Sequence, residues 1–223
     1  MKLVSRVKYF RDRYPFIGPT MWILCVEYFI AQVIVARAWS MPYSIRANTI
    51  SDLGNSICGL FNGRYVCSPF HALMNSALIC LGVFMLIGSS LIYHEFKPTK
   101  YAALGFGFMA IAGLGTVLVG VFPENSPAVL HTVGAAMPFL IGNVGIIILG
   151  AVLKLPVRLR WFSLATGIIS LIGLAFFITN YYLGLGIGGM ERIVAYPQTI
   201  WLIVFGLYIS KNHYQLRKSK PLV

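Results

Sequence analysis

The sequence predicts an all-α fold, a polytopic bundle of about six transmembrane helices with both termini in the cytoplasm. The first indication is composition, since 58% of the 223 residues are hydrophobic, only 11% are charged, and the mean hydropathy is +0.78. A soluble domain of this length cannot bury so much apolar surface. The second indication is the length of the apolar runs, about 20 residues each, which is enough to cross a hydrocarbon core of roughly 30 Å. The runs are continuous and do not alternate with polar residues, which argues against a β-barrel.

The predicted elements are six apolar spans between two basic segments. Residues 1–15 are too charged for the hydrophobic core of a signal peptide, so we expect an uncleaved segment ahead of a membrane domain at residues 16–210. Residues 211–223 form a second basic segment after that domain. The six spans are expected at residues 16–38, 69–93, 101–122, 127–153, 159–184 and 193–210.

Charged and polar residues mark the ends of these spans. Lysine and arginine residues interrupt the apolar sequence after the second and fourth spans, at residues 97–100 and 154–160. On the other side, the spans open with polar groups. Ser68-Pro69 lies at the start of the second span, Ser126-Pro127 at the start of the fourth and Glu191-Arg192 at the start of the sixth.

The distribution of basic residues gives the orientation. Of the 18 Lys and Arg residues, 14 fall in the terminal segments and in the loops after the second and fourth spans. The four on the opposite side are Arg37, Arg46, Arg64 and Arg192. The positive-inside rule then places both termini in the cytoplasm. Topology and attraction to anionic lipid headgroups account for the net charge of +12, so we expect no nucleic-acid partner.

The longest outer loop is expected at residues 39–68 and contains two cysteines, Cys58 and Cys67. The outer face of a membrane is oxidising in many cells, which favours a disulfide between them. In the entropy model, closing so short a loop stabilises the fold by roughly 3 kcal/mol. Asn62-Gly63 between the cysteines indicates a tight turn. The sequence leaves open whether the cysteines are bonded.

Ionisable residues gather at the outer level of the predicted bundle. Four of the six acidic residues map to the outer half or the outer loops: Glu27, Asp52, Glu124 and Glu191. Candidate partners at the same level are Arg46, Arg192, His71, His131 and Asn75. Ionisable groups in a membrane usually face a bundle interior or a wet cavity and have a partner. We therefore predict one outward-facing polar pocket that collects groups from several spans.

These residues allow a catalytic interpretation and a structural one. Asp52, Glu124 and His131 are the candidates for acid–base catalysis, and Glu27, Arg46, His71, Asn75, Glu191 and Arg192 are the candidates for substrate binding. Ser51 is one of several serines available near the histidines as a nucleophile. The structural alternative is that Ser51, Asp52 or Glu124 caps a helix, which remains open. Only two histidines lie on the outer side and no H-E-x-x-H motif occurs, so we predict no metal or other cofactor.

Small residues are frequent within the third span, from Gly105 to Gly115. They favour close contact between helices. The pattern is compatible with a homo-oligomer formed through this face and equally with packing inside one chain.

The motifs T-I-S-D-L-G, G-V-F-P-E-N-S followed by L-H-T, and E-R near the sixth span resemble domain-of-unknown-function family 998 of bacteria and archaea. The matching positions are Ser51, Asp52, Gly54, Pro123, His131, Glu191 and Arg192. The resemblance implies a multi-span prokaryotic membrane protein, hence a location in the plasma (inner) membrane. It implies no established activity.

The leading functional prediction is an outward-facing pocket that binds, and in one form of the hypothesis chemically modifies, a membrane lipid or a lipid-linked headgroup. A carboxylate and His131 would do the acid–base work, and Arg46 or Arg192 would hold an anionic headgroup. One alternative is a small-molecule or ion-coupled transporter that uses Glu27, inside the first span. The other is a non-catalytic membrane scaffold.

Overall fold

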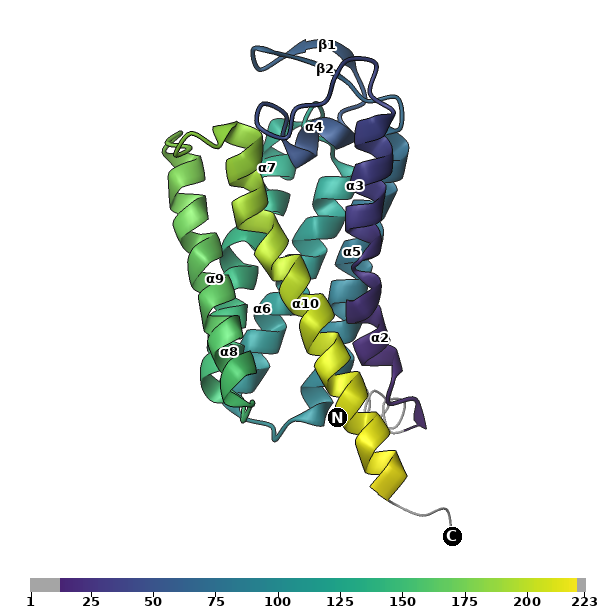
Figure 1. Ribbon diagram of the computed structural model, residues 1–223, viewed down its shortest axis with the longest axis vertical. Helices are drawn as coiled ribbons and strands as arrows, with labels where there is room; N and C mark the ends of the chain where they lie inside the picture. The colour runs from purple at the N-terminus through teal and green to yellow at the C-terminus, as the bar shows by residue number, and fades with distance from the viewer. Residues whose placement is uncertain (1–12, 220–223) are drawn as a thin grey trace.

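Six helical segments of membrane-spanning length form the bundle in Figure 1, a computed structural model that describes residues 13–219. They cover Ile17–Arg37, His71–Glu95, Lys100–Val121, Ala128–Val152, Val157–Ile178 and Gly186–Gln215. The predicted fold class, an all-α bundle of six spans, is therefore confirmed. The start of α2 and the end of α10 lie at one end of the bundle, here called the terminal end. The opposite end carries a β-hairpin and is called the hairpin end. The cytoplasmic location of the termini remains a prediction.

Two of the spans are interrupted. The first consists of α2 (Ile17–Leu24) and α3 (Glu27–Arg37), joined by a tight turn at residues 25–26. The fourth consists of α7 (Ala128–Ala136), a π-helical segment η2 (Met137–Gly142) and α8 (Asn143–Val152). Pro138 in η2 removes a backbone donor, which explains why the α-helix is not regular there.

The other spans are continuous. They are α5 (His71–Ile92), which ends in the short helix η1 (Tyr93–Glu95), then α6 (Lys100–Val121), α9 (Val157–Ile178) and α10 (Gly186–Ser219). Glycines of α6 allow close contact with its neighbours. A Cβ on Gly113 would lie 2.7 Å from the Gly82 carbonyl oxygen in α5, and a Cβ on Gly115 would lie 2.5 Å from that of Gly134 in α7. These two small residues thus pack inside the chain, while a homo-oligomer remains an untested prediction.

The limits of the fifth and sixth spans differ from the expected ones. Helix α9 ends at Ile178 and not at residue 184, and α10 begins at Gly186 and not at residue 193. Leu183 and Gly184 adopt φ angles of 50° and 78°, a left-handed conformation that a continuing helix cannot contain. The glycine-rich sequence after them, which falls between the two expected spans, is instead the first turn of α10.

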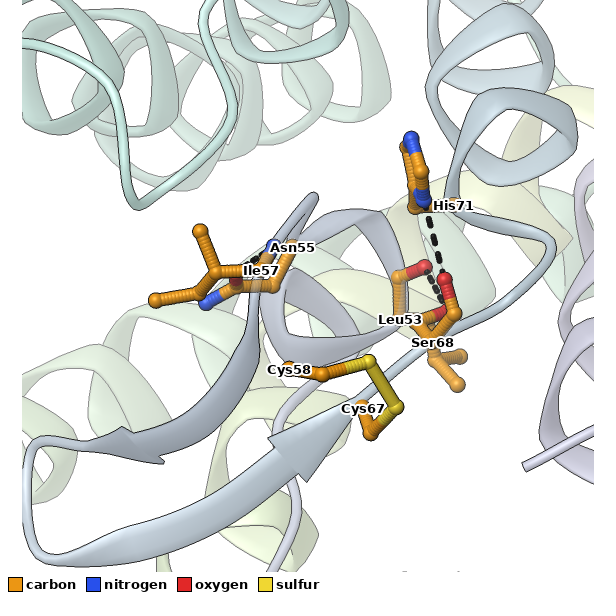
Figure 2. The surroundings of a disulfide bond; sticks show 7 residues. All are labelled: Leu53, Asn55, Ile57, Cys58, Cys67, Ser68 and His71. Carbon is orange, nitrogen blue, oxygen red and sulfur yellow. Dashed lines mark hydrogen bonds between the residues drawn. A yellow bond between two sulfur atoms is a disulfide. The ribbon is translucent and has the colours of Figure 1, made fainter. Parts of the chain in front are cut away.

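The segment between α3 and α5 holds the short helix α4 (Ile50–Gly54) and a hairpin of β1 (Cys58–Phe61) and β2 (Arg64–Cys67). Asn62 and Gly63 form the turn with φ angles of 45° and 75°, as the two-residue hairpin turn requires. Cys58 pairs with Cys67 in the antiparallel register, and the two are joined by a disulfide bond, which Figure 2 shows beside α4.

Four large aromatic side chains fill the core toward the terminal end. This aromatic cluster comprises Trp22, Phe106, Trp201 and Phe205, each at most 3% exposed. The ring centroids of Trp22 and Trp201 are 5.4 Å apart, and those of Trp201 and Phe205 are 4.7 Å apart. The two indole N–H groups are satisfied, since Trp201 donates to Ser163 Oγ at 2.7 Å and Trp22 donates to the Met85 carbonyl oxygen at 3.3 Å.

Candidate functional site

Asp52 anchors the short helix α4 at the hairpin end. Its backbone N–H donates to Thr49 Oγ1 at 2.9 Å, and its Oδ2 accepts from the Thr49 N–H at 2.9 Å, which is a capping box. Arg64 of β2 donates to both carboxylate oxygens, from Nη2 at 2.8 Å and from Nε at 3.2 Å. Burial tends to raise the pKa of Asp52, but the hydrogen bonds from Arg64 and the Thr49 backbone outweigh it and lower the pKa. Asp52 is therefore an ionised, fully buried structural anchor.

Glu191 of α10 reaches the start of α4 from the other side. One carboxyl oxygen, Oε2, makes a short hydrogen bond with the Ile50 N–H, and Oε1 lies 3.1 Å from Ser51 Oγ. The first N–H groups of a helix lack partners within it, so a carboxyl group is well placed there. Glu191 is only 4% exposed. It consequently binds α4 to α10 and holds the side chain of Ser51.

Ser51 also contacts His131 of α7. Ser51 Oγ lies 3.2 Å from His131 Nε2, and the other ring nitrogen, Nδ1, lies 2.8 Å from the Phe122 carbonyl oxygen. A carbonyl oxygen can only accept, so Nδ1 carries a hydrogen. In a neutral imidazole, Nε2 is then the acceptor. The arrangement can remove a proton from Ser51 or from a group that takes its place.

Glu124 lies beside Asp52, in the loop before α7. Asn55, which is fully buried, donates from Nδ2 to Glu124 Oε1 at 2.8 Å. Burial raises the pKa of Glu124 to about 8, and the neighbouring Asp52 carboxylate adds to this shift because two adjacent negative charges repel. At neutral pH, one carboxyl group of the pair is thus protonated and the other is ionised.

This pairing predicts a pH dependence of stability. The pKa of Glu124 lies above its ordinary value of 4.5, so its stabilising effect is complete below about pH 4.5 and is lost as the pH rises through about 8. We expect the thermal unfolding midpoint of the purified protein to fall over that range. Glu124→Gln keeps an acceptor for Asn55 and cannot ionise, so this variant should show a smaller fall. Equal pH profiles for the two proteins would contradict the assignment.

The site lines a cavity of about 570 Å³ at the hairpin end. Its polar wall contains Ser51, Arg64, Glu124, His131 and Glu191. The apolar part of the lining, here called the apolar wall, comes from η2, α9 and α10, with side chains Phe139, Leu174, Phe177, Ile178 and Ile187. Phe61 and Asn62 of the hairpin also line it, so the hairpin covers part of the cavity.

A second, smaller chamber of about 60 Å³ lies deeper in the bundle. It is lined mostly by apolar side chains of α5, α6 and α10, with Thr116 and Gln198 among the polar ones. Ser51 and Glu191 line both the cavity and the chamber, as do Ala135 and Phe139. These residues therefore form the boundary between the two hollows.

Other predicted site residues lie around the segment that carries Ser51 and do not line the cavity. Asn75 donates to the Gly54 carbonyl oxygen at 2.9 Å, and His71 Nδ1 lies 2.9 Å from that of Ser68. Figure 2 shows how Ser68 in turn donates to the Leu53 carbonyl oxygen, at 2.7 Å. These contacts hold α4 and the hairpin on the start of α5, which is a structural role.

Arg192 faces away from Glu191, although the two are adjacent in sequence. Its Nη1 donates to the carbonyl oxygens of Ile45, Asn48 and Gly188, at 3.2, 3.0 and 2.7 Å, and Nη2 makes a short hydrogen bond with Tyr43 Oη. Arg192 thus holds the loop before α4 against α10. Arg46 in this loop has an exposed side chain.

Glu27 stands apart from the polar cluster. It is the first residue of α3, at the interruption of the first span, and not in the middle of a continuous helix as expected. One of its carboxyl oxygens, Oε1, is buried and has no hydrogen-bond partner among the described residues. Glu27 lines neither the cavity nor the chamber.

Arg64 is the residue that sequence reasoning missed. The prediction counted it only as a charge and named Arg46 and Arg192 as partners for the acids. Its position directly after the Asn62-Gly63 turn was a signal that it belongs to a hairpin, but not that the hairpin folds back onto Asp52. Within residues 13–219, no group of three His, Cys, Asp or Glu residues is placed to hold a metal ion.

One of three comparisons with known proteins gave a match. A family model described as protein of unknown function, DUF998, matches residues 23–208, which include all six spans in whole or in part and the loop that carries α4. Comparisons with curated proteins and with solved structures gave no match. The chain, with six helices long and apolar enough to cross a membrane among its described residues, is a member of the DUF998 family, whose function is unknown.

Proposed function

We propose that the protein binds an amphiphilic membrane lipid, or a lipid-linked molecule, in the cavity at the hairpin end and acts on it by acid–base chemistry. The observation that carries the proposal is that charged or polar side chains and large apolar side chains line the same cavity. A molecule with a polar headgroup and a hydrocarbon chain satisfies both walls at once. A small polar solute would leave the apolar wall without a partner.

The polar wall suits a headgroup. Asp52 occupies one edge of the Arg64 guanidinium, through Nε and Nη2, and Arg64 also lines the cavity. Protonated Glu124 can donate a proton, and His131 Nε2 can accept one, so an acid and a base line the same cavity. Of the three predicted acid–base residues, the proposal keeps Glu124 and His131, and gives Asp52 the role of orienting Arg64.

The apolar wall suits a hydrocarbon chain and gives it a path from the bilayer. Ile178 lines the cavity and is 67% exposed, so the wall continues onto the outer surface of α9. That surface is rich in exposed apolar residues, including Ile168, Ile169 and Ile172. A lipid could therefore enter sideways from the membrane, without leaving the apolar phase.

The location of the hollows favours this proposal over a transporter. The aromatic cluster packs the core toward the terminal end, below the chamber, where a transport pathway would have to continue. Glu27, the group on which the transporter hypothesis depends, lines neither hollow. The polar groups instead gather at one end of the bundle.

Photo-crosslinking with a phospholipid that carries a diazirine in its acyl chain tests the proposal. In nanodiscs, the crosslinks to the wild-type protein should concentrate on the parts of α7 and α9 that line the cavity. Ala135→Phe places a ring between the cavity and the chamber and should reduce these crosslinks to the level of the outer helix faces. Val133→Phe, on an exposed part of α7, is the matched control and should leave them unchanged. Uniform crosslinking that ignores Ala135→Phe would favour the scaffold alternative.

A further inference from the structure

We propose that Ser51 is a nucleophile, activated by His131, that takes the acyl group from a carboxylic ester of the bound lipid. The inference rests on the proposed function and names its substrate class and its reaction. Nucleophilic catalysis by serine needs an adjacent base that is oriented by a third group. Here the Phe122 carbonyl oxygen orients His131 through Nδ1, and Nε2 lies 3.2 Å from Ser51 Oγ.

The two contacts of the Ser51 hydroxyl group restrict where the nearby protons can lie. Its hydroxyl has one hydrogen but lies within hydrogen-bonding distance of two groups, His131 Nε2 at 3.2 Å and Glu191 Oε1 at 3.1 Å. Both contacts are satisfied if Ser51 donates to His131 and a protonated Glu191 donates to Ser51. Glu191 Oε2 still accepts from the Ile50 N–H in this arrangement.

A second arrangement has the same number of protons. In it, Glu191 is ionised and accepts from Ser51, while a doubly protonated His131 donates to Ser51 from Nε2. The two arrangements differ by one proton that passes through the serine hydroxyl. Only the first one directs the serine hydrogen at a base and leaves both Glu191 and His131 uncharged, so it is the reactive form. Glu191 is then a positioning residue for the nucleophile.

The reaction is balanced without any oxidant or reductant. Ser51 Oγ forms a bond to the ester carbonyl carbon while its proton moves to His131 Nε2. The bond from that carbon to the alcohol oxygen then breaks, and this oxygen takes the proton from His131. Arg64 and protonated Glu124 line the same cavity and can stabilise the negative charge that develops on the carbonyl oxygen. The products are a free alcohol and an acyl group on Ser51.

The chamber indicates water as the acceptor of the acyl group. Its volume of about 60 Å³ is enough for a few water molecules, since each needs roughly 10–15 Å³ by this measure. Gln198 is 3% exposed and lines it, and its Nε2 has no hydrogen-bond partner among the described residues. A buried donor of this kind is matched by an acceptor such as water. Water would attack the acyl group and give one proton to His131, which returns it to Ser51 Oγ.

A fluorophosphonate probe, which reacts covalently with activated serines, tests the inference on the full chain in nanodiscs. We expect peptide mass spectrometry of the labelled wild-type protein to locate the adduct on Ser51. Ser51→Ala should abolish labelling, and His131→Gln should slow it by about a hundredfold or more. Ser56→Ala, in the same loop, is the matched control and should label at the wild-type rate.

The position of the shared proton gives a second readout. The amide of Glu191→Gln can donate to Ser51 from nitrogen and accept from Ile50 through oxygen, as the protonated acid does. This variant should therefore keep most of the labelling, whereas Glu191→Ala should lose it. Loss in Glu191→Gln at an unchanged unfolding midpoint would overturn the role given to Glu191.

The outcomes for the inference and for the proposed function are separate. An adduct on another residue, or none, in a wild-type protein that still shows cavity-specific lipid crosslinks would overturn the inference and leave lipid binding in place. Loss of specific crosslinks would overturn the proposed function itself. Because the adduct is located on the wild-type chain, the test does not depend on whether Ser51→Ala folds.

Discussion

Asp52→Ala should cost about 3–5 kcal/mol of unfolding free energy, the usual effect of removing one partner from a buried ion pair. The carboxylate is fully buried and accepts from both the Thr49 N–H and the guanidinium of Arg64. Its removal leaves the largely buried Arg64 without the carboxylate that pairs with it. The start of α4 loses its cap in the same step. Thermal or denaturant unfolding of the purified protein in a mild detergent measures the effect.

A double-mutant cycle separates the two causes. In Asp52→Ala/Arg64→Ala, no charge is left unpaired, so this double variant should recover part of the stability that Asp52→Ala loses. Asp52→Asn keeps an acceptor for the Thr49 N–H and should fall between wild type and Asp52→Ala. If the double variant is as unstable as the two single losses added together, the ion pair is not the reason.

Gly188→Ala is expected to have the second large effect, a loss of up to about 3 kcal/mol, because new atoms must enter a tightly packed contact. A Cβ at this position would lie 2.0 Å from the Asn48 carbonyl oxygen and 2.5 Å from that of Ile45. Both are backbone atoms, which cannot rotate away as a side chain would. The loop before α4 must move, and the hydrogen bonds from Arg192 to the same two carbonyl oxygens must lengthen or break.

The neighbouring glycine provides a matched control. A Cβ on Gly189 would meet only Leu185, at 3.0 Å, within the chain segment just before it. Gly189→Ala should therefore be close to neutral, since the better helix propensity of alanine offsets the small contact. Equal unfolding midpoints for Gly188→Ala and Gly189→Ala would contradict the idea that the glycine-rich sequence serves close packing. Weaker fluorophosphonate labelling in Gly188→Ala would show that the displacement reaches Ser51.

The helices could be predicted because the length and continuity of an apolar run are local properties. Their limits were less certain where the sequence is rich in glycine. Residues 186–189 were interpreted as a loop, since glycine usually indicates flexibility, but the structure uses Gly186 and Gly188 where another chain segment approaches closely. The approaching segment is the loop that contains Asn48, about 140 residues earlier in the chain. A pattern among neighbouring residues cannot predict such a contact.

The sequence predicted at which end of the bundle the ionisable residues lie. It predicted only some of the residues that contact one another there. The distribution of basic residues and the predicted span limits placed Asp52, Glu124, His131 and Glu191 at the same end of the bundle. In the structure, these four residues gather around α4. The division of roles depends on tertiary contacts. Arg64 and not Arg46 pairs with Asp52, because the hairpin folds back over α4. Arg192 and Glu191 contact different partners, because neighbouring residues on a helix lie about 100° apart around its axis.

The aromatic cluster has a consequence for energetics in the cell. Because Trp22, Phe106, Trp201 and Phe205 pack the core toward the terminal end, the proton exchanged by Glu191, Ser51 and His131 remains within one half of the bundle. Work against a transmembrane voltage requires charge to cross the bilayer. Turnover at this site should therefore be electrically silent and should continue at the same rate when an ionophore collapses the membrane potential.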